Sequence, residues 1–412
     1  MTTKLRAASF QDGAVTTAKI AADAVTNAKI ADGAIDSDAI GSLAITNAKL
    51  AADANKGRRN IAINGAMQIA QRGTSQASIT TAGYYTVDRF YMNINDAGTW
   101  TQSQQALATT HTPFLNGFTT ALKLQCTSSA TPAANGTCQI NYRIEGRDLQ
   151  HFKTGSASPE KMTVSFWIKA TKTGTNVIGS YQDEGGKSTG QTYTINASDT
   201  WEYKTITFPG NTHDAIANDT TRGRQITWYF SAGSNRQSGT LQSTWENYAV
   251  GDEAPGQVNH ADSTSNSILI TGVQIELGDK ATDFEHRSFG EELELCKRYF
   301  ERMFRGGNAP SGTEISIVSA GVWYGSTQVL AMFRYSPKRA SPTITISETD
   351  FIGFYGNGYF RSSTSTSPFD MITSGAARIN IGSWNAGGTA GDGAFGILKN
   401  DNTSNVSIDA EL

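Results

Sequence analysis

Two pairs of neighbouring carboxylates are the residues of this chain best suited to acid–base chemistry. They are Asp183 with Glu184 and Asp252 with Glu253. A glycosidase uses two carboxyl groups, one as acid and one as base or nucleophile, on either side of the bond that breaks. Adjacent carboxylates on turns are usually only solvated, so we expect no catalysis at either pair.

Other reactive side chains form no recognisable catalytic or metal-binding motif. The run GGKST at 185–189 lacks the earlier glycine of a phosphate-binding loop, because Tyr181 stands there, and we expect an exposed hairpin turn. Cys126, Cys138 and Cys296 have no metal-ligand spacing. Cys126 and Cys138 could face each other in a hairpin, but reduced, buried thiols are the favoured state. We expect no enzyme activity, no cofactor and no metal.

Aromatic side chains beside amides and arginine suit sugar binding, because a pyranose has one apolar face and a rim of hydroxyls. Candidate binding residues are Trp245 and Tyr248 in a loop-like segment, and Trp323, Tyr355, Asn357, Tyr359, Arg361, Trp384 and Asn385 among the glycines of the last hundred residues. The open alternative is that these aromatics pack subunit interfaces.

The elements that would position these residues are mainly β-strands. From about residue 60, short runs rich in Val, Ile, Thr and aromatics alternate with Gly, Asn, Asp and Ser, which is typical of a β-sandwich or barrel. In TVSFWIKA, Val164, Phe166 and Ile168 share one face. Such alternation indicates one core face and one face that is at least half exposed.

One helix is predicted at 288–304. Ser288 and Glu291 have the spacing of a capping box, and basic residues follow toward the carboxyl end. An apolar stripe is expected to lie on a sheet, formed by Leu293, Cys296, Tyr299, Phe300 and Met303. The glycine-rich stretch 306–312 is the expected boundary between a central domain of 58–305 and a separate C-terminal β-domain of 313–412.

The first 57 residues carry a repeat of ten residues, AVTTAKIAAD and its variants. Large apolar residues recur every five positions, at Val15, Ile20, Val25, Ile30, Ile35, Ile40, Ile45 and Leu50. This spacing matches neither a helix stripe nor one strand face. The favoured partner is another copy of the same segment, so these residues are predicted to lie along an axis shared between copies. A flexible linker is the alternative.

The composition and net charge of the chain argue against nucleic-acid binding and membrane insertion. The chain has 412 residues, 38% hydrophobic and 17% charged, with a net charge of −3. An electrostatic phosphate binder needs a surplus of Lys and Arg, so no nucleic-acid partner is expected. No run approaches the roughly 18 apolar residues that span a bilayer, and the first residues lack a signal-peptide core. We therefore expect that the protein does not insert into a membrane. We also expect that it is synthesised in a cytoplasm.

Five blocks in order resemble bacteriophage virion proteins of the tail-fibre and receptor-binding type. They begin with NIAINGAMQIAQRGTS and YYTVDRFYM, continue with MTVSFWIKATKTGT and TWEYKTITFPG, and end with ITGVQIELGDKATDFEHRSFGEELELCKRYFERM. The likeness covers about residues 59–304, and the decads also look like those near the amino ends of phage fibres. Similar sequences share the FEHRS block, which implies a structural role for His286.

The resemblance implies a homotrimeric fibre, with the apolar column from Val15 to Leu50 along its trimer axis. The fibre would be assembled in the host cytoplasm and located on the virion tail. The 1–57 segment would attach to a tail or adaptor protein, and 58–305 would be a jelly-roll sandwich similar to carbohydrate-binding modules. Residues 313–412 would bind a bacterial surface glycan or envelope protein without catalysis. Two alternatives stay open: a tailspike-type polysaccharide depolymerase, and an architectural tail protein with no receptor contact.

Overall fold

The computed structural model describes residues 58–303, 316–325, 328–346, 352–356, 359–362, 369–381, 389–398 and 405–412. They all belong to one compact unit, Lys56–Leu412. The decad repeat and its apolar column from Val15 to Leu50 lie outside the described residues. No described helix is long and apolar enough to cross a bilayer.

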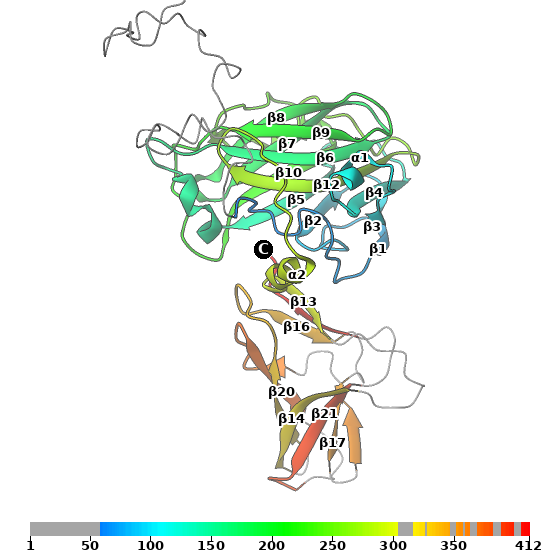
Figure 1. The fold of residues 1–412 in the computed structure, drawn as a ribbon, viewed down its shortest axis with the longest axis vertical. Helices are drawn as coiled ribbons and strands as arrows, with labels where there is room; N and C mark the ends of the chain where they lie inside the picture. The colour runs from blue at the N-terminus through cyan, green and yellow to red at the C-terminus, as the bar shows by residue number, and fades with distance from the viewer. Residues whose placement is uncertain are drawn as a thin grey trace, which may run out of the picture. The chain divides into compact units, whose positions relative to one another are not determined.

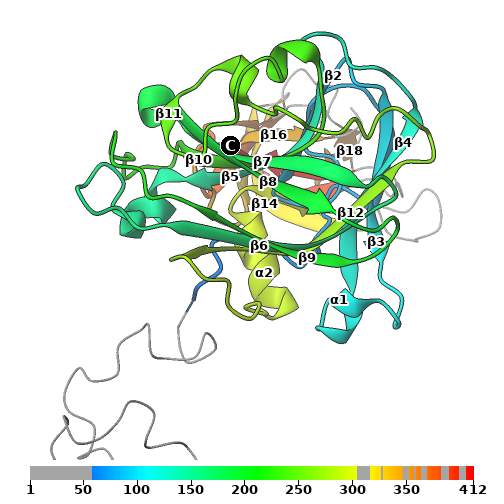
Figure 2. The same cartoon turned by 90° about the horizontal axis from the view of Figure 1, so that it is seen from above.

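Two six-stranded antiparallel sheets form a β-sandwich of the expected jelly-roll type (Figures 1 and 2). The first sheet has the order β1 (Ser75–Ile79), β3 (Thr99–Ala106), β4 (Thr120–Ser128), β12 (Ser267–Leu277), β6 (Met162–Ala170) and β9 (Glu202–Phe208). The second has the order β11 (Glu246–Asn247), β8 (Lys187–Ile195), β7 (Gly174–Gln182), β10 (Arg222–Ala232), β5 (Thr137–Glu145) and β2 (Phe90–Asn95). The prediction of a mainly β chain is confirmed.

Alternating residues of both sheets fill the space between the layers. Val164, Phe166 and Ile168 of β6 are buried in this core, as the alternation in the sequence predicted. The Phe166 ring meets Trp228 of β10 edge-on at 5.7 Å between ring centroids. Contacts of this kind between aromatic rings from facing layers join the two sheets.

The cysteines of the sandwich are free and buried, but no hairpin joins them. Cys126 lies on β4 in the first sheet and Cys138 on β5 in the second. Burial raises the pKa of both thiols. Because the thiolate is the reactive form, these cysteines act as small core residues.

The helix α2 spans Phe289–Lys297 and is shorter than predicted. Its start is as expected, since Ser288 Oγ accepts a hydrogen bond from Glu291 N at 3.3 Å. Its predicted end at 304 is wrong, because Phe300–Met303 form strand β13. Pairing with a distant strand overrides the local helical spacing there. The outcome for the predicted stripe is mixed: Tyr299 and Phe300 are buried, and Leu293 is only partly buried.

The C-terminal part contains two further antiparallel sheets. The small sheet has the order β13, β22 (Val406–Asp409) and β16 (Thr343–Ile346). The larger has the order β18 (Tyr359–Ser362), β17 (Ile352–Gly356), β21 (Gly393–Leu398), β14 (Ser316–Gly325), β15 (Gln328–Arg334), β20 (Ala376–Ile381) and β19 (Phe369–Asp370). A second core lies between them and includes Phe333, Ile344, Ile379 and Ile408.

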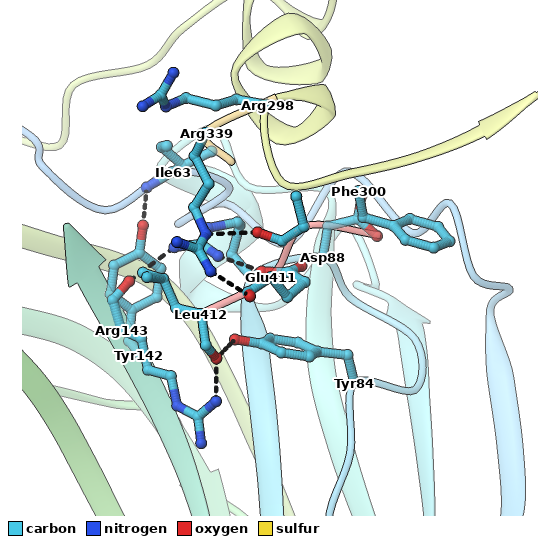
Figure 3. Close-up of polar contacts among 12 residues, drawn as sticks. Ile63, Tyr84, Asp88, Tyr142, Arg143, Arg298, Phe300, Arg339, Glu411 and Leu412 are labelled. Carbon is cyan, nitrogen blue, oxygen red and sulfur yellow. Dashed lines mark hydrogen bonds and ion pairs between the residues drawn. The ribbon is translucent and has the colours of Figure 1, made fainter. Parts of the chain in front are cut away.

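The predicted domain boundary between 305 and 313 does not separate two independent units. Strand β13, expected in the central domain, belongs to the small C-terminal sheet. The last residues in turn dock on the sandwich, where Glu411 forms an ion pair with Arg89. Arg339 also donates to the Glu411 main-chain oxygen at 2.7 Å (Figure 3). The chain therefore crosses between the two parts more than once.

Candidate functional site

The second sheet of the sandwich carries a cleft of about 410 Å³ on its outer side. Alternate residues of β5 line it: Gln139, Asn141 and Arg143. The residues between them, such as Ile140 and Tyr142, point into the core. The neighbouring strand β10 contributes the matching set Gln225, Thr227 and Tyr229. The two-residue period of the strands thus separates a polar cleft floor from an apolar core.

A loop after β10 forms a wall of the cleft and includes the short 3₁₀ helix η7 (Val250–Asp252). Tyr248 in this loop is 43% exposed and stands edge-on to Tyr181 of β7, with ring centroids 5.5 Å apart. Its hydroxyl donates to Glu253 Oε1 at 2.6 Å. The loop can approach β8 because Gly190 has no side chain. A Cβ there would lie 2.5 Å from Leu241 Cδ1.

Arginines in the cleft are held by carboxylates and amides. Arg222 contacts both oxygens of Asp183, at 2.5 and 2.6 Å, and donates to Gln225 Oε1 at 2.9 Å. Its hydrogen bond to Asp183 raises the pKa of the Arg222 guanidinium. Arg143 Nε donates to the same Gln225 oxygen at 3.3 Å. These contacts fix planar donor groups in position before any ligand arrives.

Two amide oxygens of the cleft have no partner among the described residues. They are Asn141 Oδ1 on the floor and Gln242 Oε1 on the wall, and both atoms are buried. An unsatisfied buried acceptor costs about 1–3 kcal/mol. A ligand with several hydroxyl donors could satisfy these oxygens, while the tyrosine rings contact its apolar face.

The two carboxylate pairs that the sequence offers for acid–base chemistry are held by hydrogen bonds and ion pairs within the protein. Asp252 accepts from Thr240 N at 2.8 Å and from Gln242 Nε2 at 2.9 Å. Glu253 forms an ion pair with Arg236. The other pair, at 183–184, stands in the turn of the β7–β8 hairpin. The turn expected at GGKST is confirmed only for Gly185 and Gly186, because strand β8 begins at Lys187. Within the described ranges, no group of three His, Cys, Asp or Glu could hold a metal ion.

Of the aromatic residues predicted to bind sugar, one lines the cleft and two are buried in the fold. Tyr248 lines the cleft. Trp245 is only 4% exposed, its Nε1 donates to Pro209 O at 2.8 Å, and Arg224 lies over its ring at 4.7 Å. Trp323 is 1% exposed and belongs to the C-terminal core. The prediction of these two tryptophans as binding faces is therefore corrected, because their rings support the fold.

Three of the remaining candidates lie in strands of the larger C-terminal sheet. Tyr355 is in strand β17, and Tyr359 and Arg361 are in strand β18. Asn357, Trp384 and Asn385 lie outside the described residues.

Most residues that line the cleft are not among the binding residues predicted from the sequence. Gln139 and Asn141 in CQINYRI, and Gln225 and Thr227 in RQITWYF, are the polar members of alternating strands. Polar residues at such positions usually indicate only the solvent face of a sheet. The one feature of the sequence that could have indicated the cleft is that two predicted strands both place amide side chains on the solvent face.

Comparisons with known proteins identify no family. No protein-family model and no curated protein sequence matches the chain. The enzymatically active domain of tailspike protein 4 of bacteriophage CBA120 aligns at 14% identity and a TM-score of 0.27, over 53% of this chain and 21% of that one. The aligned part thus spans about a fifth of the tailspike chain.

Carbohydrate-binding modules are also among the solved structures that match. A family 11 module of a cellulosomal cellulase of Clostridium thermocellum aligns at 12% identity and a TM-score of 0.24, over 51% of this chain and 98% of that one. A module solved with β-1,4-galactotriose aligns at 10% identity and a TM-score of 0.24, over 53% and 99%. Likeness at this level carries no argument about ligands. The fold and the cleft together define a β-sandwich with a polar, tyrosine-lined cleft on one sheet.

Proposed function

We propose that this protein binds glycans, without cleaving them, in the cleft over β5, β7 and β10. The observation that carries the proposal is the combination of fixed arginine and amide groups, tyrosine rings and two unpartnered amide oxygens in one cleft. Amides and guanidinium groups bond pairs of neighbouring hydroxyls, and an aromatic ring covers the apolar face of a sugar.

The non-catalytic part of the proposal is supported by the state of the carboxylates. Glu253 accepts from Tyr248 and pairs with Arg236, while both oxygens of Asp252 accept hydrogen bonds. A glycosidase needs two carboxyl groups on opposite sides of the scissile bond, and these two are adjacent in one loop wall.

The finer proposal is that the chain is a tail-fibre protein of a bacteriophage virion. Its support is the five-block sequence resemblance together with the decads of the first 57 residues. In this proposal the amino end attaches to a tail or adaptor protein, three copies associate, and the sandwich contacts a bacterial surface glycan. Residues 313–412 stay a proposed second contact with the host.

The glycan proposal is tested with the full chain on an array of bacterial capsular and O-antigen oligosaccharides. We expect binding to at least one structural class, confirmed by titration calorimetry. Tyr248→Ala should weaken it about tenfold, or ~1.4 kcal/mol, through loss of the ring. Tyr248→Phe keeps the ring and should retain most of the affinity. Leu115→Ala, an exposed residue of helix α1 (Thr112–Leu115) outside this cleft, is the matched control.

Three outcomes would count against parts of this proposal. Equal affinity of Tyr248→Ala and the unmodified chain would remove the cleft from the binding site. Time-dependent release of reducing ends from a bound polysaccharide would establish cleavage and favour the depolymerase. Unchanged phage adsorption in the presence of excess protein would favour an architectural role on the virion.

A further inference from the structure

The first sheet carries a separate pocket of about 570 Å³ on its outer side. Trp167 of β6 and Tyr203 of β9 are paired neighbours across these adjacent strands. Phe284 and His286, from the segment between β12 and α2, line the same pocket. Figure 2 shows β6 and β9 in the layer opposite β7 and β8. This pocket and the proposed glycan cleft are therefore on different sheets.

The aromatic rings that line this pocket are tilted relative to one another and do not form one flat surface. The Trp167 and Tyr203 rings are 5.2 Å apart at 51°, and Phe284 and His286 are 4.8 Å apart at 66°. Gly272 allows the walls to converge. A Cβ at this position would lie 2.8 Å from Phe118 Cζ and 3.1 Å from Trp167 Cδ1. Its φ of +63° is also a conformation that favours glycine.

Polar groups of the pocket are largely engaged within the protein. Thr282 Oγ1 donates to Glu276 Oε2 at 2.6 Å, and Asn116 Nδ2 donates to Thr112 O at 2.8 Å. His286 Nε2 is 3.2 Å from Asn116 O. This differs from the glycan cleft, where amide oxygens lack partners. A sugar would find fewer open hydrogen-bonding groups here.

One carboxylate, that of Asp283, is among the residues that line the pocket. Asp283 is exposed and forms no ion pair with any residue in the described ranges. No Lys or Arg is among the described lining residues. Arg59 is nearby but donates to the Asp283 main-chain oxygen, at 3.0 Å. Burial raises the pKa of Tyr203, and the charges of Glu276 and Asp283 raise it further, against hydrogen bonds from Ser165 and Thr205.

We infer that this pocket binds a quaternary ammonium group of the choline type. Such a cation has no hydrogen-bond donor, so it does not need the groups that the protein has already engaged. Aromatic faces attract it through their π electrons, with Trp the strongest, and a carboxylate adds Coulombic attraction. The inference does not depend on glycan binding by the other sheet.

Titration calorimetry of the full chain with choline chloride tests this inference. We expect millimolar or tighter binding, and at least about tenfold weaker binding of the neutral isostere in which tert-butyl replaces trimethylammonium. Asp283→Asn and Tyr203→Ala should each weaken choline binding about fivefold to tenfold. Asp283 is exposed, so its replacement leaves the fold intact. Tyr248→Ala, in the cleft of the other sheet, should leave choline binding unchanged.

Two further probes distinguish possible sources of the cation. Phosphocholine represents a decorated surface polymer, and phosphatidylcholine vesicles represent a membrane. Equal binding of choline and its neutral isostere would overturn the inference in favour of a plain apolar pocket. Binding of a neutral hexose that Tyr203→Ala abolishes would make this a second sugar site. If calorimetry detects no heat of binding at choline concentrations up to about 10 mM, the inference is overturned outright.

Discussion

At the scale of single residues, two buried titratable groups of the sandwich respond to pH in opposite directions. Asp88 is fully buried, and burial raises the pKa of its carboxyl to about 6, although Arg72 and Gln71 lower it in part. His260 is also fully buried, with Nε2 2.8 Å from Asn176 Oδ1, and burial lowers its pKa to about 4. Their effects on stability overlap in the same acidic range.

Asp88 should favour the folded state at low pH. Because its folded pKa is above the ordinary value of 3.8, its contribution is fully present below that value and is lost as pH rises through about 6. We expect the stability of the parent relative to Asp88→Asn to fall by up to about 3 kcal/mol over this range. Urea unfolding at several pH values measures it. A difference that does not vary with pH would mean that Asp88 keeps an ordinary pKa.

His260 should act in the opposite sense. Its folded pKa is below the ordinary value of 6.5, so the unfolded chain binds the extra proton and stability rises with pH from about 4 to 6.5. We expect the stability of the parent relative to His260→Gln to increase over this interval. The same unfolding series tests it. A decreasing difference would show that the imidazole is stabilised as a cation.

At the scale of elements, the small sheet of β13, β22 and β16 decides where α2 ends. Phe300 to Met303 pair with Val406 to Asp409, residues about a hundred positions later in the chain. Buried Ile408 of β22 packs in the C-terminal core. Since no window around residue 300 contains this partner, the local spacing alone could not reveal the strand.

Truncation in this sheet should be more costly than truncation of the helix. We expect Ile408→Ala to lower the free energy of unfolding by about 2–5 kcal/mol, because it leaves a cavity in a closed core. Leu293→Ala should cost less, since Leu293 is only partly buried. Denaturant unfolding of both variants measures the difference. An equal or larger cost at Leu293 would mean that α2 carries more of the packing than its burial indicates.

At the scale of the whole molecule, the end of the chain connects the sandwich to the C-terminal sheets. Glu411 pairs with Arg89 and, at 3.4 Å, with Arg72, and both arginines belong to the sandwich. The Arg89 guanidinium also lies 3.3 Å from the centre of the Tyr299 ring. Both side chains of the Arg89–Glu411 pair are nearly inaccessible to solvent. An unpaired charge in this position is strongly unfavourable.

Breaking this pair should destabilise both parts of the compact unit together. We expect Glu411→Gln to lower the free energy of unfolding by about 3–5 kcal/mol, because it leaves Arg89 buried without its partner. Calorimetry should show one transition for residues 58–412 that moves to lower temperature as a whole. Two separate transitions, of which the substitution moves the earlier one and leaves the later one unchanged, would show that the parts fold independently.

The homotrimer remains a prediction, which rests on the resemblance to phage fibres and on the decad repeat. Burying a Val or Ile side chain contributes roughly 1.5–3 kcal/mol, so eight levels along a shared axis could offset much of the ordering entropy. Sedimentation should give three copies at micromolar concentration. A monomer would contradict the prediction, and a trimer that survives removal of residues 1–57 would shift its origin to the β-domains.

Local patterns in the sequence determined the class of the fold and several of its details. The alternation of TVSFWIKA, the hairpin turn at Gly185 and Gly186 and the cap at Ser288 each depend on residues within a few positions of one another. These features follow from backbone geometry and from hydrogen bonds between near neighbours, so they can be recognised without the tertiary structure.

The tertiary structure alone decided the cleft, the aromatic pocket and the burial of the tryptophans. Asn141 and Thr227 are far apart in sequence but pair across β5 and β10, and Trp167 pairs with Tyr203 in the same way. Trp245 and Trp323 resembled exposed candidates because each stands in a polar or glycine-rich stretch, yet distant segments cover both. Binding sites depend on which strands become neighbours, and that choice is made by long-range packing, which a local pattern does not contain.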